Sequence, residues 1–348
     1  MAVTATPRVG IARVRTAALR TAFGLLVGAI LIVAFLRLVD ISAVSRRLSH
    51  LSIGFAALCG AAFLAAFVVR ALRWRWLLRP DDVGAVRVVA IYQVANFVNW
   101  LLPIRGGELV KSLLLRRSDG IPVSRSLATV SMDKAMDLLP AVALLALVPF
   151  VSLHLSRPLW VLLFSALGAV ILGVLVLTLA TWRRERALAL ITRAMAAVLP
   201  RRVRGQVEPF IVLFVDTLLG LIRQPRLLLV AVAYTAAAVS LDALSCALAF
   251  KAVGVSVALP VVLYGYTFYN LAFILPTPPG QVGSNELIGL LIFSGVFGVS
   301  RDGVGAMFLF SHPWTSILIT CTGLVCLSWM GLSLRSALRL ASDQGATQ

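Results

Sequence analysis

The stretch AIYQVANFVNWLLPIRGGELVKSLLLRR, from Ala90 to Arg117, decides the fold of this chain. It begins as an apolar helix, breaks at Pro103, and continues as a short basic helix. Arg105, two glycines and Glu108 lie beside the break. A charged break inside an apolar segment is typical of a binding site, because charge in a membrane is costly unless it faces a cavity or a partner.

The composition predicts an α-helical membrane protein. The chain has 348 residues, of which 60% are hydrophobic and 13% charged, and its mean hydropathy is +0.97. Several apolar runs reach the roughly 20 residues with which a helix crosses a hydrocarbon core of about 30 Å. None shows the alternating pattern of a membrane β-strand. We therefore expect an all-α, polytopic protein of the inner membrane of a bacterial or archaeal cell.

The net charge of +18 would suggest nucleic acid for a soluble protein, but here the arginines gather in the loops between apolar runs. This distribution follows the positive-inside rule and favours contact with anionic lipids, so we expect no nucleic-acid partner. The four cysteines lie in apolar runs without CxxC spacing, which predicts neither a disulfide framework nor a zinc site.

The apolar runs predict about six full spans in a single transmembrane domain covering residues 1–348. The basic segment 1–17 and the tail 333–348 are expected in the cytoplasm, as is a basic amphipathic connector at 182–226. Arg73, Arg75 and Arg79 are expected at the cytoplasmic interface. The spans are predicted at Ala18–Val39, Ser52–Leu72, Ser126–Leu153, Leu159–Thr181, Leu227–Phe250 and Val304–Leu332.

Two broken segments predict re-entrant hairpins. The apolar part of the first segment is short for a full span. Basic residues before and after this segment are expected on the same side of the membrane, so the chain should enter and return on that side. A second apolar run, Val257–Val299, is again broken at prolines and followed by glycines and a glutamate. Following the crossings places the two hairpins on opposite faces, which suggests an inverted repeat.

Backbone that is freed at these breaks must line protein or a polar cavity, because an unmet amide in hydrocarbon costs several kcal/mol. Gly106, Gly107, Gly280 and Gly283 allow sharp turns and close approach to a ligand or another helix. Helix N-termini after the breaks would suit phosphate. A packing hairpin without a ligand is the alternative.

Charged residues in or near the apolar segments strengthen the functional interpretation. Asp133 and Asp137 share a helix face, so a cation such as Lys134 or Arg105 would have to separate them. Glu286 has no basic residue within a helical turn, which suggests contact with a proton or a headgroup. Asp242 has an open role, and His312 is interpreted as a packing histidine.

One acidic motif would suit a metal-dependent transferase. Asp133 and Asp137 in DKAMD have the D-x3-D spacing that could hold Mg²⁺ against a prenyl diphosphate, but a second acidic motif is missing and Lys134 would oppose the metal. No hydrolase, zinc-enzyme or ATPase motif is present in the sequence. We therefore expect no enzymatic activity, no cofactor and no bound metal.

Two motifs carry a resemblance to a known family. The segment NFVNWLLPIRGGELVKSLLLRRSDGIPVSRSLATVSMDKAMDLL, Asn96–Leu139, and the segment LPTPPGQVGSNE, Leu275–Glu286, resemble the signatures of flippase-like membrane proteins related to the transmembrane region of lysylphosphatidylglycerol synthases. The resemblance covers nearly the whole chain, without the soluble synthase domain. The family commonly has a glutamate–arginine pair where this chain has Asp133 and Lys134, and often a basic residue near His312.

The resemblance implies movement of a lipid between leaflets. The substrate would be an anionic phospholipid or a polyprenyl-phosphate-linked glycolipid. A non-enzymatic scaffold for a cell-envelope glycosyltransferase is one alternative, and a Mg²⁺-dependent prenyl or lipid transferase is another. With the charged residues above, the matched motifs give a candidate headgroup site of Asn99, Arg105, Gly107, Glu108, Lys111, Asp133, Lys134, Asp137, Pro279, Gly280, Gly283 and Glu286.

Overall fold

A computed structural model describes residues 24–102, 106–137, 201–272 and 277–333, together with isolated residues between 139 and 193. These residues form helices and no strand, which confirms the all-α fold class. Arg105, the terminal segments 1–17 and 334–348, and all of the predicted span at 159–181 except Phe164 and Gly168 lie outside the described residues.

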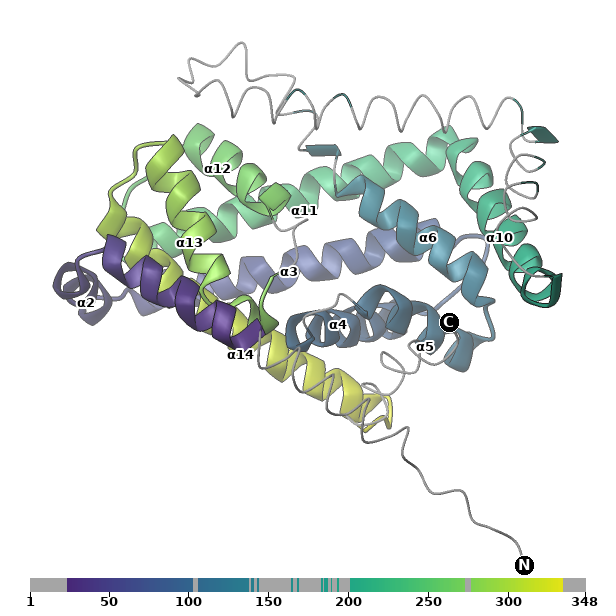
Figure 1. The fold of residues 1–348 in the computed structure, drawn as a ribbon, viewed down its shortest axis with the longest axis horizontal. Coiled ribbons are helices and arrows are strands. Elements are labelled where there is room, and N and C mark those ends of the chain that lie inside the picture. The colour runs from purple at the N-terminus through teal and green to yellow at the C-terminus, as the bar shows by residue number, and fades with distance from the viewer. Residues whose placement is uncertain are drawn as a thin grey trace, which may run out of the picture.

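Two long helices, α3 (Ile53–Leu77) and α11 (Pro225–Ala252), lie side by side through the middle of the molecule (Figure 1). They run antiparallel. The Ser52 N–H donates to the Ala252 carbonyl at 2.9 Å at one end, and the Trp76 indole donates to the Leu227 carbonyl at 3.2 Å at the other. Small side chains such as Ala66 and Ala231 are fully buried, which lets membrane helices approach closely.

The first broken segment is a helical hairpin of α4 (Ala85–Leu101) and α5 (Gly107–Asp119). The Gly107 N–H donates to Asn99 Oδ1 at 2.7 Å near the tip. The Lys111 ammonium lies 3.7 Å from the Tyr92 ring centroid farther down. At the base, Arg87 Nη1 pairs with Asp119 Oδ1 at 2.6 Å. The chain thus returns along itself, as the sequence predicted.

The second broken segment is also a hairpin. Its outward arm is α12 (Leu259–Ala272), and its return arm joins the 3₁₀ turn η2 (Pro279–Gln281), α13 (Ser284–Leu290) and the π-helix η3 (Leu291–Val296). Its two arms are in contact, because the Phe268 and Phe297 rings stack 5.8 Å apart and the neighbouring Tyr269 bonds to Asn285.

The two hairpins open at opposite ends of the α3–α11 pair, and their tips meet. The first opens beside the last turn of α3, whereas the second follows the last turn of α11. At the junction, Trp100 of α4 lies against Gly280 of η2. The prediction of oppositely oriented hairpins is confirmed for the described residues.

The remaining described helices surround this frame. The helix Gly24–Leu38 turns by 90° into the short helix α2 (Ile41–Ser49). Helix α6 (Val123–Met136) follows the first hairpin and α14 (Arg301–Trp329) follows the second, so the order long helix, hairpin, helix occurs twice. Helix α10 (Arg201–Ile222) packs on α6.

Length and apolarity make three described helices, α3, α11 and α14, candidate spans, or four if the bent pair Gly24–Leu38 and α2 counts as one. The prediction of six spans stays a prediction. One boundary was wrong: α3 continues beyond Leu72 to Leu77 and carries Arg73 into the interior, where its side chain is fully buried. Arg73 is therefore no interfacial residue.

Gly107 sets the spacing within the first hairpin. A Cβ atom at this position would lie 2.2 Å from the Ala95 carbonyl oxygen and 2.7 Å from Asn99 Cγ, and helix backbone cannot move aside cheaply. We expect Gly107→Ala to lower the stability by about 1–3 kcal/mol, the usual cost of overpacking. Thermal unfolding in detergent would measure this.

The matched control is Gly84→Ala. Gly84 precedes α4, and a Cβ there would meet nothing within 4 Å. Equal melting temperatures for the two variants would contradict the role assigned to Gly107.

Candidate functional site

Arg73 lies at the centre of a buried ionic network. Its Nε donates to Asp133 Oδ1 at 2.7 Å and its Nη2 to Asp137 Oδ1 at 2.7 Å. Nη1 donates to Thr235 Oγ1 at 2.9 Å, and Nη2 also reaches the Asp133 carbonyl at 2.9 Å. The side chains of Arg73 and Asp133 are 0% exposed, so this one guanidinium joins α3, α6 and α11 away from solvent.

This geometry corrects the predicted partner of the two aspartates. The cation between Asp133 and Asp137 is Arg73 rather than Lys134, whose Nζ approaches Asp137 at 3.7 Å. Arg73 was missed because its RWRWLLRP context resembles an interfacial loop. The available signal was its spacing from Arg70, since residues three apart on a helix share a face.

The network continues into the first hairpin through Glu108. Its carboxylate lies 3.1 Å from Lys111 Nζ and 3.2 Å from Lys134 Nζ, which joins α5 to α6. Lys111 also lies 3.9 Å from Asp133, and its side chain is only 1% exposed. Five of the predicted site residues are therefore brought together: Glu108, Lys111, Asp133, Lys134 and Asp137.

At its other end the network reaches α11 through Arg70. This guanidinium pairs with Asp242 and lies 3.7 Å from Asp137, so Asp242 is part of the network and no longer without a role. Formal charges balance in the whole set, because four cations face four carboxylates. The members are Arg70, Arg73, Lys111, Lys134, Glu108, Asp133, Asp137 and Asp242.

One edge of the network is open. The Lys134 side chain is 46% exposed, that of Asp137 29% and that of Glu108 23%, in contrast to the closed centre at Arg73. Asn99 stands beside this edge, since its Nδ2 lies 3.4 Å from Glu108 Oε1 while its Oδ1 accepts the Gly107 N–H. The open edge therefore adjoins the break of the first hairpin.

Glu286 is the centre of a second cluster, at the tip of the other hairpin. Its Oε2 accepts the Gly283 N–H at 2.8 Å, which caps α13. Its Oε1 lies 2.5 Å from His312 Nδ1 of α14. The prediction that Glu286 lacks a basic neighbour holds only along the sequence, and His312 is a polar partner rather than a packing residue.

His312 ties the tip of the second hairpin to α14. Its Nε2 lies 2.8 Å from the Gly280 carbonyl, and because a carbonyl only accepts, Nε2 is the donor. The contact between Nδ1 and Glu286 then needs one further proton, on either partner. The Glu286–His312 pair consequently holds one proton between two buried groups.

The predicted glycines and proline position this tip. Gly280 and Gly283 have φ of 63° and 78°, values that side chains rarely adopt. A Cβ on Gly283 would lie 2.4 Å from the Gly28 carbonyl oxygen, and Pro279 packs against Gly24. The tip therefore fits closely against the helix Gly24–Leu38.

Neither cluster resembles a metal centre. Among the described residues no group of three His, Cys, Asp or Glu side chains is arranged to hold an ion. Arg73 also occupies the space between Asp133 and Asp137 that a magnesium ion would need. The first cluster instead has partly exposed ion pairs between Lys134 and two carboxylates, beside the break of the first hairpin.

Comparison with known proteins identifies the family. Residues 21–323, which include both hairpins and both clusters, match the lysylphosphatidylglycerol synthase TM region. The chain belongs to this family. A UPF0104 membrane protein of Methanothermobacter thermautotrophicus is 25% identical over 283 residues, covering 76% of this chain and 80% of the relative. No solved structure matches the chain.

Two arginines of α3 should differ sharply in their effect on stability. Arg73→Met leaves Asp133 buried without its main partner, and breaking a buried pair in this way costs about 3–5 kcal/mol. Arg75→Gln removes a pair with Asp82 at 3.1 Å and a 2.6 Å hydrogen bond from Nε to the Val83 carbonyl, which together should cost about 1–2 kcal/mol. Thermal unfolding of both variants in the same detergent measures the difference.

A second comparison separates charge from shape. Arg73→Lys retains the positive charge but not the forked donors that reach two aspartates, so its melting temperature should fall between those of wild type and Arg73→Met. A melting temperature of Arg73→Met equal to that of Arg75→Gln would refute the central role of Arg73.

Proposed function

We propose that this membrane protein moves a lipid with an anionic, phosphate-bearing headgroup between leaflets. The observation that carries the proposal is the open edge of the network, where Glu108, Asp137 and Lys134 are partly exposed beside the break of the first hairpin. A charged site at a helix break is where a membrane protein can bind a polar group away from water.

The chemistry of binding would be an exchange of ion pairs. Lys134 is held by Glu108 and Asp137, and a phosphate entering the open edge competes with these carboxylates for its ammonium. Arg105, which follows the break in sequence, would add a forked donor that matches phosphate. Because the network is neutral without the ligand, the headgroup meets no large opposing charge.

The meeting of the hairpin tips suggests how access would alternate. Trp100 and Gly280 touch at the junction, and the Glu286–His312 pair anchors the second tip to α14. If the hairpin tips separated toward one end of the molecule, the open edge of the network would be accessible only from the side of the membrane that this end faces. The sequence has no nucleotide motif, so movement is proposed to be downhill or ion-coupled, with the proton of Glu286–His312 as one coupling candidate.

The substrate class comprises anionic phospholipids and polyprenyl-phosphate-linked glycolipids, which share the phosphate group that this site would bind. The transferase alternative is disfavoured, because Arg73 fills the space between its two proposed metal ligands. A scaffold for a glycosyltransferase would leave the network dispensable, so the same experiment separates the two functions.

Lys134→Gln should reduce lipid movement at least tenfold in proteoliposomes containing fluorescent phosphatidylglycerol, because it removes the exposed ammonium and leaves Glu108 paired with Lys111. Dithionite quenching measures the fraction of lipid that has crossed. Arg117→Gln, an exposed change in the last turn of α5, is the matched control and should move lipid at the wild-type rate.

Two results would end this proposal. The first is wild-type protein that moves neither phosphatidylglycerol nor a polyprenyl-phosphate lipid faster than empty liposomes. The second is Lys134→Gln protein that is as active as the control.

We further propose that the end where the first hairpin opens faces the cytoplasm of the cell. Exposed and partly exposed arginines are concentrated there. The helix Gly24–Leu38 begins toward this end, and α14 ends toward it. The positive-inside rule then places both chain termini in the cytoplasm. The arginines are Arg75, Arg79, Arg87, Arg116, Arg117 and Arg125.

Single-cysteine variants test this orientation in a background without the four native cysteines. Ser45→Cys in α2 should react with an impermeant maleimide in intact cells, whereas Arg117→Cys should react only after permeabilisation. The reverse labelling pattern would show that the orientation is inverted.

A further inference from the structure

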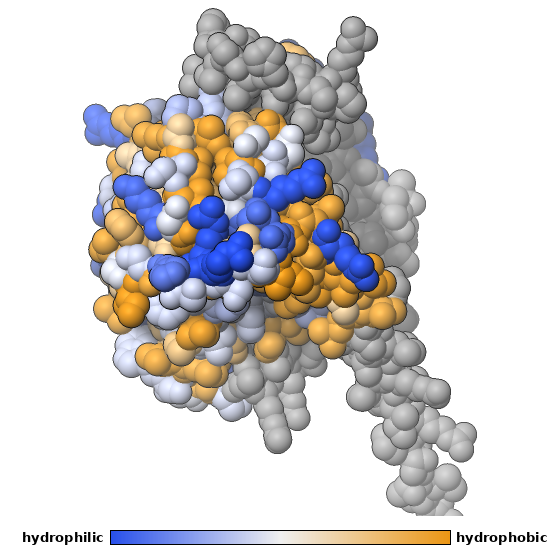
Figure 2. Space-filling view, turned by 90° about the vertical axis from the view of Figure 1, so that its left-hand side faces the viewer, coloured by the Kyte–Doolittle hydropathy of each residue, from blue (hydrophilic) through white to orange (hydrophobic). Residues whose placement is uncertain are grey.

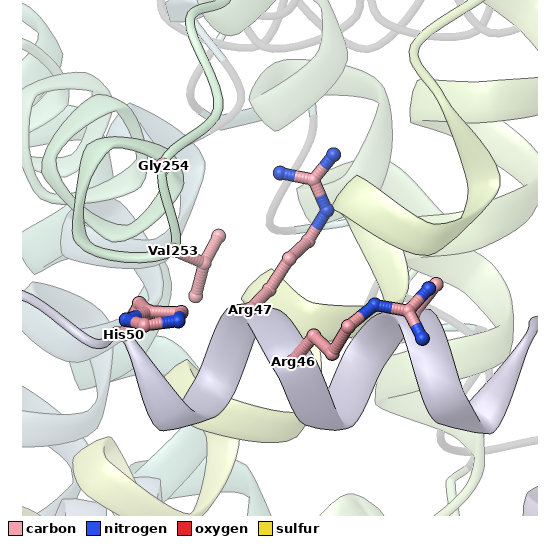
Figure 3. Close-up of a pocket in the computed structure, with 6 residues that line it drawn as sticks. Arg46, Arg47, His50, Val253 and Gly254 are labelled. Carbon is pink, nitrogen blue, oxygen red and sulfur yellow. The ribbon is translucent and has the colours of Figure 1, made fainter.

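A second basic site lies at the end of the molecule opposite the opening of the first hairpin. A cavity of about 350 Å³ separates α2 from the turn after α11, and it is lined by Ala43, Arg46, Arg47, His50, Val253 and Gly254. In Figure 3, Arg47 rises from α2 beside the turn that carries Gly254, while His50 lies next to Val253. Sites for small ligands commonly occupy about 300–1,000 Å³.

The arginines of this cavity keep their hydrogen-bonding capacity for a ligand. Within the described part of the chain, neither Arg46 nor Arg47 lies within ion-pair distance of a carboxylate, and Arg46 makes only a 3.5 Å contact with Ser42 Oγ. At the opposite end, by contrast, Arg75 pairs with Asp82 and Arg87 with Asp119. Both arginines line the cavity, and their unpaired guanidinium groups can donate to an anion.

Helix α2 holds these arginines at a fixed angle to the helix that precedes it. It turns by 90° from the helix Gly24–Leu38, so it lies along the membrane surface if that helix crosses. Asp40 caps it, accepting from the Ser42 N–H at 2.8 Å, and Val44 is buried against Gly305 of α14. The arginines therefore sit on a fixed platform rather than on a free loop.

Apolar surface surrounds this cluster. Figure 2 shows hydrophilic residues gathered near the middle of this face with hydrophobic surface around them. Ile41 of α2 is 61% exposed, Ile53 at the start of α3 is 82% exposed, and Leu259 at the start of α12 is 64% exposed. Such a surround suits the glycerol and acyl parts of a lipid, while the arginines suit its phosphate.

We propose that the cavity between α2 and the α11–α12 turn binds a phosphate group, held by Arg46 and Arg47 with His50 beside it. The source of the phosphate is a lipid headgroup or the free anion, and the two share the same arginine chemistry. This site goes beyond the proposed function, because it is separate from the network around Arg73 and binding there requires no movement of lipid.

Calorimetry of the purified full-length protein in detergent tests the site with two probes, inorganic phosphate and a short-chain phosphatidylglycerol. The double variant Arg46→Gln/Arg47→Gln should lower the affinity for at least one probe tenfold or more. Arg37→Gln, an exposed arginine at the same end that does not line the cavity, should stay within twofold of wild type.

The probes identify the source. Loss of phosphatidylglycerol binding alone assigns a lipid headgroup, and an equal loss for inorganic phosphate assigns the free anion. No binding by wild type, or equal binding by the double variant, overturns the site. The conservative variant Arg47→Lys separates loss of binding from misfolding. It retains the positive charge and should bind with an affinity between those of wild type and the double variant.

A final comparison keeps this site distinct from the proposed function. Lys134→Gln should fail to move lipid yet retain the part of phosphatidylglycerol binding that Arg46→Gln/Arg47→Gln removes. Conversely, loss of binding in Lys134→Gln with normal binding in the arginine double variant would place the phosphate at the ionic network and reject the α2 site.

Discussion

The contact of one buried guanidinium with two aspartates is the interaction on which the described structure depends most. Arg73 connects α3 to α6 through Asp133 and Asp137, and to α11 through Thr235. A buried charge without a partner costs a large free energy, so the Arg73 guanidinium and its aspartates must stay in contact. This requirement holds the three helices together. The network then extends to the first hairpin because Lys111 shares Asp133 with Arg73.

Close packing of backbone provides the second constraint. Gly107 lets α5 return against α4, and Gly283 lets the second tip rest on the helix Gly24–Leu38. Both hairpins can then penetrate far enough for Trp100 to meet Gly280. The two charged clusters therefore lie on either side of one junction between the hairpin tips.

Much of the site was predictable from the sequence, because charged residues in apolar segments need partners. That reasoning found Glu108, Lys111, Asp133, Lys134, Asp137 and Glu286, and it found both hairpins. It missed Arg70 and Arg73, which follow an apolar run in the manner of interfacial arginines, and it undervalued His312. Each missed residue contacts a partner at least 26 positions away along the chain, so no local pattern could reveal the pairing.

The sequence by itself determined the all-α membrane fold, the two breaks and the family, since apolar length, proline and glycine act locally. Tertiary structure alone decided which cation serves which carboxylate, that the tips meet, and that Arg46 and Arg47 face a cavity without acidic partners. The physical reason is that ion pairing and close packing depend on distances between helices. Helices α3, α6 and α11 are far apart in sequence and come together only when the chain folds.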